Sequence, residues 1–208
     1  MNQRKSMISI IDYGLGNLKS VHKALNSLGF TSKVTSSVRD IDNCNGIIFP
    51  GVGSFGDCMK ELDERGLIDS LKKSINSGKP FMGICLGLQI LFEKSEESPN
   101  VQGLSILKGE ISKIKFAKNL KVPHMGWNKI NKTKNSSILE GINSDAWMYF
   151  VHSFKFDNDL KITDSISSYG ETFSASINKD NVFATQFHPE KSSSVGLNVL
   201  KNFADLCI

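Results

Sequence analysis

The sequence is poor in arginine, and this shortage bears on what the protein binds. Only three of its 25 basic residues are arginines, at positions 4, 39 and 65. Arginine is the side chain that reads phosphate and guanine with two parallel hydrogen bonds. Residues 108–134 carry eight lysines against one glutamate, which is more typical of a solvated or partner-docking face. We therefore expect no nucleic-acid partner, although the formal net charge is +4.

Cysteines are few and widely spaced. Cys44, Cys58, Cys85 and Cys207 form no Cys-x-x-Cys pair, and none has a histidine pair nearby. This spacing indicates neither a zinc site nor a disulfide framework, so we expect no metal. It favours a reducing compartment, and a cytoplasmic protein is the expectation.

Long apolar runs are absent as well. The most apolar window, residues 81–92, has 12 residues, whereas a membrane span needs roughly 18, so we expect no membrane association. Residues 1–6 lack the apolar segment of a signal peptide. We expect them to be a short extension, followed by a single domain of residues 7–208.

What the sequence does contain is an alternation of strands and helices. Apolar runs at 8–12, 46–50 and 81–84 each lead through a turn into a helical pattern, which predicts an open, mostly parallel α/β sheet flanked by helices. After Pro99 the pattern changes, and we expect antiparallel strands added to the same sheet at 104–107, 110–116, 146–154, 162–167 and 173–186. The chain closes with a predicted helix over 193–206, with an apolar stripe of Val195, Val199, Leu200, Phe203 and Leu206.

Cys85 stands out among the cysteines because of its surroundings. Gly83-Ile-Cys85-Leu-Gly87 has the spacing of a nucleophile elbow, a sharp turn from strand to helix that exposes one reactive side chain. A lone cysteine after an apolar strand is more often a small buried core residue. A position at a helix start favours the reactive reading, because the helix dipole and free N–H groups stabilise a thiolate.

His188 is the best candidate for the base that a cysteine nucleophile needs. It follows an apolar strand in Phe187-His188-Pro189-Glu190, and in extended chain residues two apart point to the same side. Glu190 can therefore orient the imidazole as the third member of a triad. A satisfied structural histidine is an equally good reading of the pattern. His124 and His152 remain second-rank candidates, and His22 is expected on a helix surface.

A glycine-rich loop and a buried amide complete the candidate site. Residues 51–56 match Gly-x-Gly-x-x-Gly formally, but they do not follow the first strand, so a dinucleotide site is disfavoured. The loop can instead present backbone N–H groups to an oxyanion. Gln89 is the one strongly polar side chain in its apolar window, so either the fold or a ligand must satisfy its amide.

With these residues in view, the chain resembles the class I glutamine amidotransferases. Within them it is similar to the glutaminase subunits of imidazole glycerol phosphate synthases, in the histidine pathway. The likeness covers nearly the whole chain after Met7 and rests on the segments Asp12–Asn17, Pro50–Gly53, Gly83–Gln89, Val122–Asn128, Tyr149–Phe154 and Ala184–Ser192.

The resemblance implies a role for each matching residue. Cys85 would attack glutamine, His188 would shuttle the proton and Glu190 would orient the imidazole, with no cofactor. The residues expected to hold the substrate or its oxyanion are Gly51, Gly53, Leu86, Gln89, Ser153 and Phe154. Ammonia would pass to a separate (β/α)₈ cyclase subunit in a heterodimer, and the residues expected to face that partner are Asn17, Trp127, Tyr149 and Lys191. The segment around Trp127 follows Pro123 and has no periodic apolar pattern, so we expect it to be a loop.

Three other functions compete with this interpretation. A homologous subunit could supply ammonia for amidation of a bacterial surface sugar, with the same triad. A free-standing γ-glutamyl hydrolase would need no cyclase. A binding or scaffold module that has lost catalysis would be expected to have a broken triad, whereas this sequence keeps all three residues.

Overall fold

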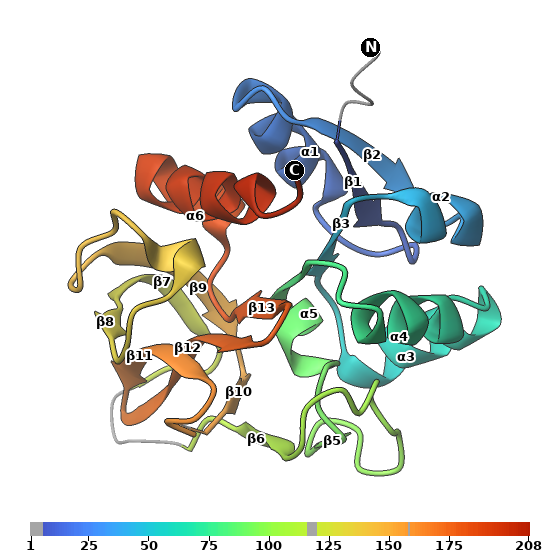
Figure 1. The fold of residues 1–208 in the computed structure, drawn as a ribbon. Coiled ribbons are helices and arrows are strands. Elements are labelled where there is room, and N and C mark those ends of the chain that lie inside the picture. Colours follow the sequence, from blue (N-terminus) through green and yellow to red (C-terminus); the bar gives the residue numbers. More distant parts are fainter. Residues whose placement is uncertain (1–5, 116–119, 158) are drawn as a thin grey trace.

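The centre of the protein is an eight-stranded sheet (Figure 1). The computed structural model describes residues 6–115, 120–157 and 159–208. The strands of this sheet, in spatial order, are β2 (Thr31–Thr35), β1 (Met7–Ile11), β3 (Gly46–Gly51), β4 (Phe81–Cys85), β13 (Val182–Thr185), β12 (Glu171–Lys179), β11 (Thr163–Tyr169) and β8 (Asn131–Lys132). The first five pair in parallel and the last three antiparallel. The predicted fold class is confirmed.

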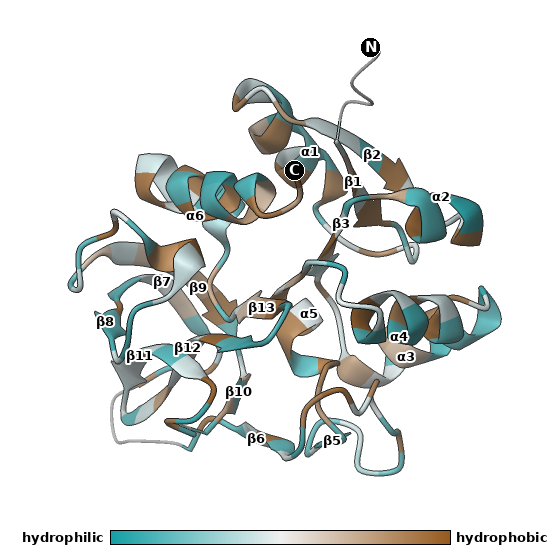
Figure 2. Cartoon of the chain, viewed as in Figure 1, coloured by the Kyte–Doolittle hydropathy of each residue, from teal (hydrophilic) through white to brown (hydrophobic). Residues whose placement is uncertain are grey.

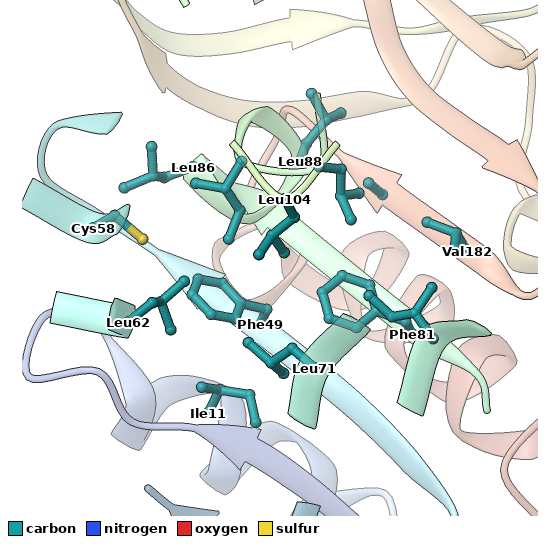
Figure 3. Close-up of a cluster of buried hydrophobic side chains, with 14 of the residues drawn as sticks. Ile11, Phe49, Cys58, Leu62, Leu71, Phe81, Leu86, Leu88, Leu104 and Val182 are labelled. Atoms are coloured by element: carbon teal, nitrogen blue, oxygen red, sulfur yellow. The ribbon is translucent and has the colours of Figure 1, made fainter. Parts of the chain in front are cut away.

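Helices cover both faces of the parallel half of the sheet (Figure 1). They are α1 (Leu18–Ser27), α2 (Val38–Asn43), α3 (Phe55–Glu64), α4 (Ile68–Asn76), α5 (Leu86–Gln89) and α6 (Ser193–Asp205), with short 3₁₀ turns η1 (Ser137–Leu139) and η2 (Pro189–Lys191). Strand residues alternate between the two faces. Phe49 packs with α3 and α4, a cluster seen in Figure 3, whereas Ile48 packs with α1 and α6. In Figure 2 hydrophilic residues colour much of α2, α4 and α6.

Two smaller sheets hold strands that were expected in the main one. β10 (Phe154–Phe156), β6 (Glu110–Lys113) and β5 (Lys94–Ser95) form one, and β7 (His124–Lys129) pairs with β9 (Trp147–His152) in the other. The prediction that all later strands join the central sheet is therefore wrong in part. A break at Ser153 separates β9 from β10 and lets the chain change sheets. Residue 116, the end of one predicted strand, lies outside the described residues.

Two other local predictions are wrong. Residues 104–107 form an irregular segment whose N–H groups at Leu104 and Leu107 donate to carbonyls of the turn after α5, and both side chains are buried. The apolar run at 104–107 thus indicates that these side chains are buried, not that the segment forms a strand. In α6, Ala204 is buried instead of Leu206, which is 40% exposed beyond the helix end. None of the helices in the described parts of the chain is long and apolar enough to cross a membrane.

The topology brings three distant segments to one edge of the sheet. β4 lies between β3 and β13, and all three run in parallel, so their carboxyl ends meet. Gly51 and Cys85 are register partners, as are Ile84 and Thr185. In open α/β sheets, ligands bind at the carboxyl ends of the strands. The glycine loop, Cys85 and the segment around His188 therefore share the expected position of a site.

Candidate active site

Cys85 occupies the strained turn that its glycine spacing predicts. Its backbone has φ 55° and ψ −104° between β4 and α5, a conformation that costs a non-glycine residue about 1–3 kcal/mol. A Cβ added at Gly83 would lie 2.3 Å from the Gly87 carbonyl oxygen, and one at Gly87 would lie 2.1 Å from the Phe49 carbonyl oxygen. Only glycine allows this close backbone approach. The helix that follows, α5, has four residues.

His188 and Glu190 form a buried pair. Nδ1 of His188 lies 2.9 Å from Oε1 of Glu190, and both side chains are almost fully enclosed. The predicted pairing is present, but its predicted geometry is wrong. Only His188 is extended, and Glu190 lies in the 3₁₀ turn η2, which begins at Pro189. The tight turn, rather than an extended strand, brings the carboxylate back to the ring.

The charges around His188 favour its protonated form. Burial opposes a charged imidazole, but the neighbouring Cys85 sulfur and the Glu190 carboxylate outweigh burial and raise the pKa of His188 above its usual value. Nε2, the nitrogen that does not face Glu190, makes no hydrogen bond to any described residue. The imidazole can therefore take a proton at Nε2 while Nδ1–H is held by the carboxylate.

A pocket of about 270 Å³ opens beside the sulfur. Cys85 and His188 line it. So do five of the six predicted substrate residues, namely Gly53, Leu86, Gln89, Ser153 and Phe154. Gly51 is not at the pocket wall, because it packs beneath Leu86, whose Cβ would lie 2.6 Å from an added Cβ. Among the described residues, no three histidine, cysteine or acidic side chains are grouped so as to hold a metal ion.

The fold itself satisfies the Gln89 amide. Nε2 of Gln89 donates to the Phe154 carbonyl at 3.0 Å and to Oε1 of Gln186 at 3.2 Å. Nε2 of Gln186 in turn lies 3.6 Å from the Cys85 sulfur. Sequence reasoning missed Gln186, although its polar side chain next to an apolar strand end is a signal of the same kind as Gln89.

Tyr13 is a second residue that the sequence analysis missed. Its hydroxyl accepts a hydrogen bond from the Val52 N–H at 3.0 Å and donates one to the Val52 carbonyl at 3.1 Å. The ring is fully buried and stacks on Phe49. Val52 is the centre of the glycine loop from which oxyanion donors were expected. Tyr13 therefore occupies one N–H group of that loop in this structure.

Three of the four predicted partner residues lie together. Trp127 lies in strand β7, not in a loop as predicted, and is 50% exposed. Its ring meets that of Tyr149 edge-on, with centroids 6.1 Å apart, and the Lys191 ammonium lies 5.8 Å from the centre of the Tyr149 ring. Asn17 is half-buried just before α1, at the carboxyl end of β1.

Comparison with known proteins agrees with this fold. The family model of class I glutamine amidotransferases matches residues 9–206. The chain belongs to the class I glutamine amidotransferase family. A structure of PurLQS from Thermotoga maritima superposes with a TM-score of 0.76 at 20% sequence identity, and the match covers 97% of this chain and 98% of the other. At that identity the likeness shows the fold alone.

Curated relatives show which group within this family the chain resembles. The imidazole glycerol phosphate synthase subunit HisH of Caldanaerobacter subterraneus subsp. tengcongensis is 46% identical over 201 residues, which cover 96% of this chain and 98% of the relative. The subunit of the same name from Aquifex aeolicus is 48% identical over 196 residues, 93% of this chain and 94% of the relative. This chain is therefore similar over almost its full length to HisH subunits.

Proposed function

We propose that this chain is the glutaminase subunit of an imidazole glycerol phosphate synthase, which hydrolyses L-glutamine to glutamate and ammonia. One observation carries the chemistry: the thiol of Cys85, on a strained backbone turn, shares a pocket with a buried histidine that is held by a buried carboxylate. The similarity to HisH subunits supports the histidine pathway. It does not favour amidation of a surface sugar.

The covalent step uses Cys85 and His188. The sulfur attacks the side-chain amide carbon of glutamine, and a C–S bond forms as the C–N bond breaks. His188 accepts the thiol proton at Nε2 and gives it to the departing nitrogen, which leaves as ammonia. Water then hydrolyses the glutamyl thioester, which releases glutamate and restores the thiol. Glu190 keeps Nδ1–H of the ring in place and stabilises the imidazolium.

Backbone groups bind the developing oxyanion and the substrate in this proposal. The N–H of Leu86 follows the nucleophile directly, the usual place of one oxyanion donor in an elbow. The Gly51–Gly53 loop supplies a second donor. Gln89 and the backbone of Ser153 and Phe154, which also line the pocket, hold the glutamine.

Ammonia then passes to a (β/α)₈ cyclase subunit. There it reacts with a phosphoribulosyl-aminoimidazole carboxamide intermediate to give imidazole glycerol phosphate and aminoimidazole carboxamide ribotide. We place this partner against the face that carries the exposed ring of Trp127, together with Tyr149, Lys191 and Asn17. The proposed location is the cytoplasm, in keeping with four cysteines that are all free thiols.

Glutamate release by the purified chain, with and without a cyclase subunit, tests the proposal. We expect the cyclase to increase the rate and to yield imidazole glycerol phosphate from glutamine. A chain that releases glutamate equally fast alone is a free-standing γ-glutamyl hydrolase. A chain that releases none under either condition is not a glutaminase.

A further inference from the structure

Two buried histidines lie directly behind the pocket, and the mechanism above uses neither. His124 begins β7, His152 ends β9, and the two are register partners in this small sheet. His124 is 2% exposed and His152 is 5% exposed. Only His152 reaches the pocket wall.

A continuous chain of hydrogen bonds runs through both rings. Nδ1 of His152 lies 2.9 Å from the Phe154 carbonyl oxygen. Nε2 of His152 lies 2.9 Å from Nδ1 of His124. Nε2 of His124 lies 3.3 Å from the side-chain nitrogen of Asn128. The Phe154 carbonyl also accepts from Gln89, so the chain ends on the pocket wall.

The groups at the two ends of this series of hydrogen bonds, the Phe154 carbonyl and the Asn128 amide, determine where each proton lies. A carbonyl oxygen only accepts, so Nδ1 of His152 must carry its hydrogen, and Nε2 must accept from His124. Nδ1 of His124 therefore also carries its hydrogen, and its Nε2 accepts from the Asn128 amide, which is turned by its second bond to the Ser168 carbonyl. Both rings are Nδ1–H tautomers, and every nitrogen has a partner.

Burial keeps both rings neutral and fixed. It lowers the pKa of His124 to about 4 and that of His152 to about 3, the latter with further contributions from the nearby His124 and His188. The ring of His124 stacks between Tyr169 and Phe150, at centroid distances of 4.0 and 4.9 Å. An added proton would place two N–H donors face to face.

We propose that His152, held by His124 and Asn128, is a positioning residue that fixes the Phe154 peptide for glutamine binding. This inference rests on the proposed glutaminase function. Phe154 follows the break between β9 and β10, so the Ser153–Phe154 turn needs contacts beyond β9 to hold it. The His152 and Gln89 donors converge on the Phe154 carbonyl and set the orientation of the pocket wall.

Two substitutions at His152 separate this role from a merely structural one. In His152→Phe an aromatic ring is kept and the donor to Phe154 is lost, and we expect KM for glutamine to rise about tenfold, more than kcat falls. In His152→Asn the side-chain amide can donate from the place of Nδ1, and we expect KM to stay within about twofold of wild type. His22→Asn, on α1, is the matched control.

The measurement is glutamine hydrolysis by the complex with the cyclase. Alkylation of Cys85 by iodoacetamide counts the competent sites, so a folding defect changes that count and not KM. An unchanged KM in His152→Phe, or an equal rise in His152→Asn, overturns the proposal.

A second readout needs no activity. Nitrogen NMR of the ¹⁵N-histidine-labelled free chain is expected to show the proton on Nδ1 of both His124 and His152. A proton on Nε2 of His152 would contradict the hydrogen bonds described between His124, His152 and Phe154. A wild-type complex that releases no glutamate refutes the proposed function. The tautomers of His124 and His152 still test whether these hydrogen bonds hold the Phe154 carbonyl.

Discussion

The hydrogen bonds between Tyr13 and Val52 make Tyr13→Phe an informative substitution. The phenyl ring can keep its stacking on Phe49, where the centroids are 4.9 Å apart and the planes 12° apart, so no packing is lost. The variant loses one hydroxyl that serves both the N–H and the carbonyl of Val52. Each such bond contributes about 0.5–1.5 kcal/mol. Val52 is 38% exposed, so water can replace part of what is lost.

We therefore expect Tyr13→Phe to lower the free energy of unfolding by about 1 kcal/mol. The effect on activity should have the opposite sign. The Val52 N–H cannot donate to Tyr13 and to a substrate oxyanion at once, so its release lowers the barrier by about the value of that hydrogen bond. Glutamate release by the chain without its partner is expected to rise about fivefold.

Tyr169→Phe is the matched control, because its hydroxyl also donates to a backbone carbonyl, that of Lys121 and not of the Gly51–Gly53 loop, and because the phenyl ring can keep its stacking on His124. Urea unfolding and a glutamate assay on the free chain give both quantities. A Tyr13→Phe chain that is folded and alkylated normally at Cys85, but that releases glutamate no faster than wild type, would refute the role given to the Val52 N–H.

Three further predictions concern the partner face, the triad and pH. Trp127→Ala is expected to leave the melting temperature of the free chain nearly unchanged but to weaken association with the cyclase at least about tenfold. Thermal unfolding and titration against the cyclase measure these two quantities. A collapsed melting temperature with normal affinity would show that Trp127 is a core residue. Glu190→Gln is expected to lose less glutaminase activity than His188→Ala, and equal losses would give the carboxylate a larger role. The native pKa values of His124 and His152 lie below the unfolded value of 6.5, so their contribution to the free energy of unfolding is full above that pH and is lost as pH falls. Between pH 6.5 and 5.5 the wild type should lose about 2 kcal/mol more of this free energy than the double variant with asparagine at both positions. Equal losses in urea unfolding would contradict neutral burial of the two histidines.

Local sequence patterns were sufficient to locate the elbow. Glycine on either side of Cys85 is required because the backbone of α5 touches those of β4 and β3, and such a requirement is visible in the sequence. The strand-helix alternation also predicted the parallel sheet, because periodicity reports which side chains are buried.

Contacts between distant segments could not be predicted in this way. Nothing local to Tyr13 indicates that its hydroxyl meets Val52, and nothing local to His124 indicates His152, since both contacts depend on how strands from different parts of the chain pair. The apolar residues 104–107 packed as an irregular segment because burial alone does not require a strand. The sequence around Trp127 predicts a loop, although it forms a strand, because only one face of its two-stranded sheet is buried.

Covalent labelling of Cys85 tests the central claim most directly. The complex with the cyclase would be treated with an electrophilic glutamine analogue and the adduct mapped by mass spectrometry, with an excess of glutamine as competitor. We expect one adduct, on Cys85, that glutamine suppresses, and we expect Cys85→Ala to lose glutaminase activity while the complex still uses free ammonium. An adduct on Cys44, Cys58 or Cys207 with Cys85 unmodified would contradict the account.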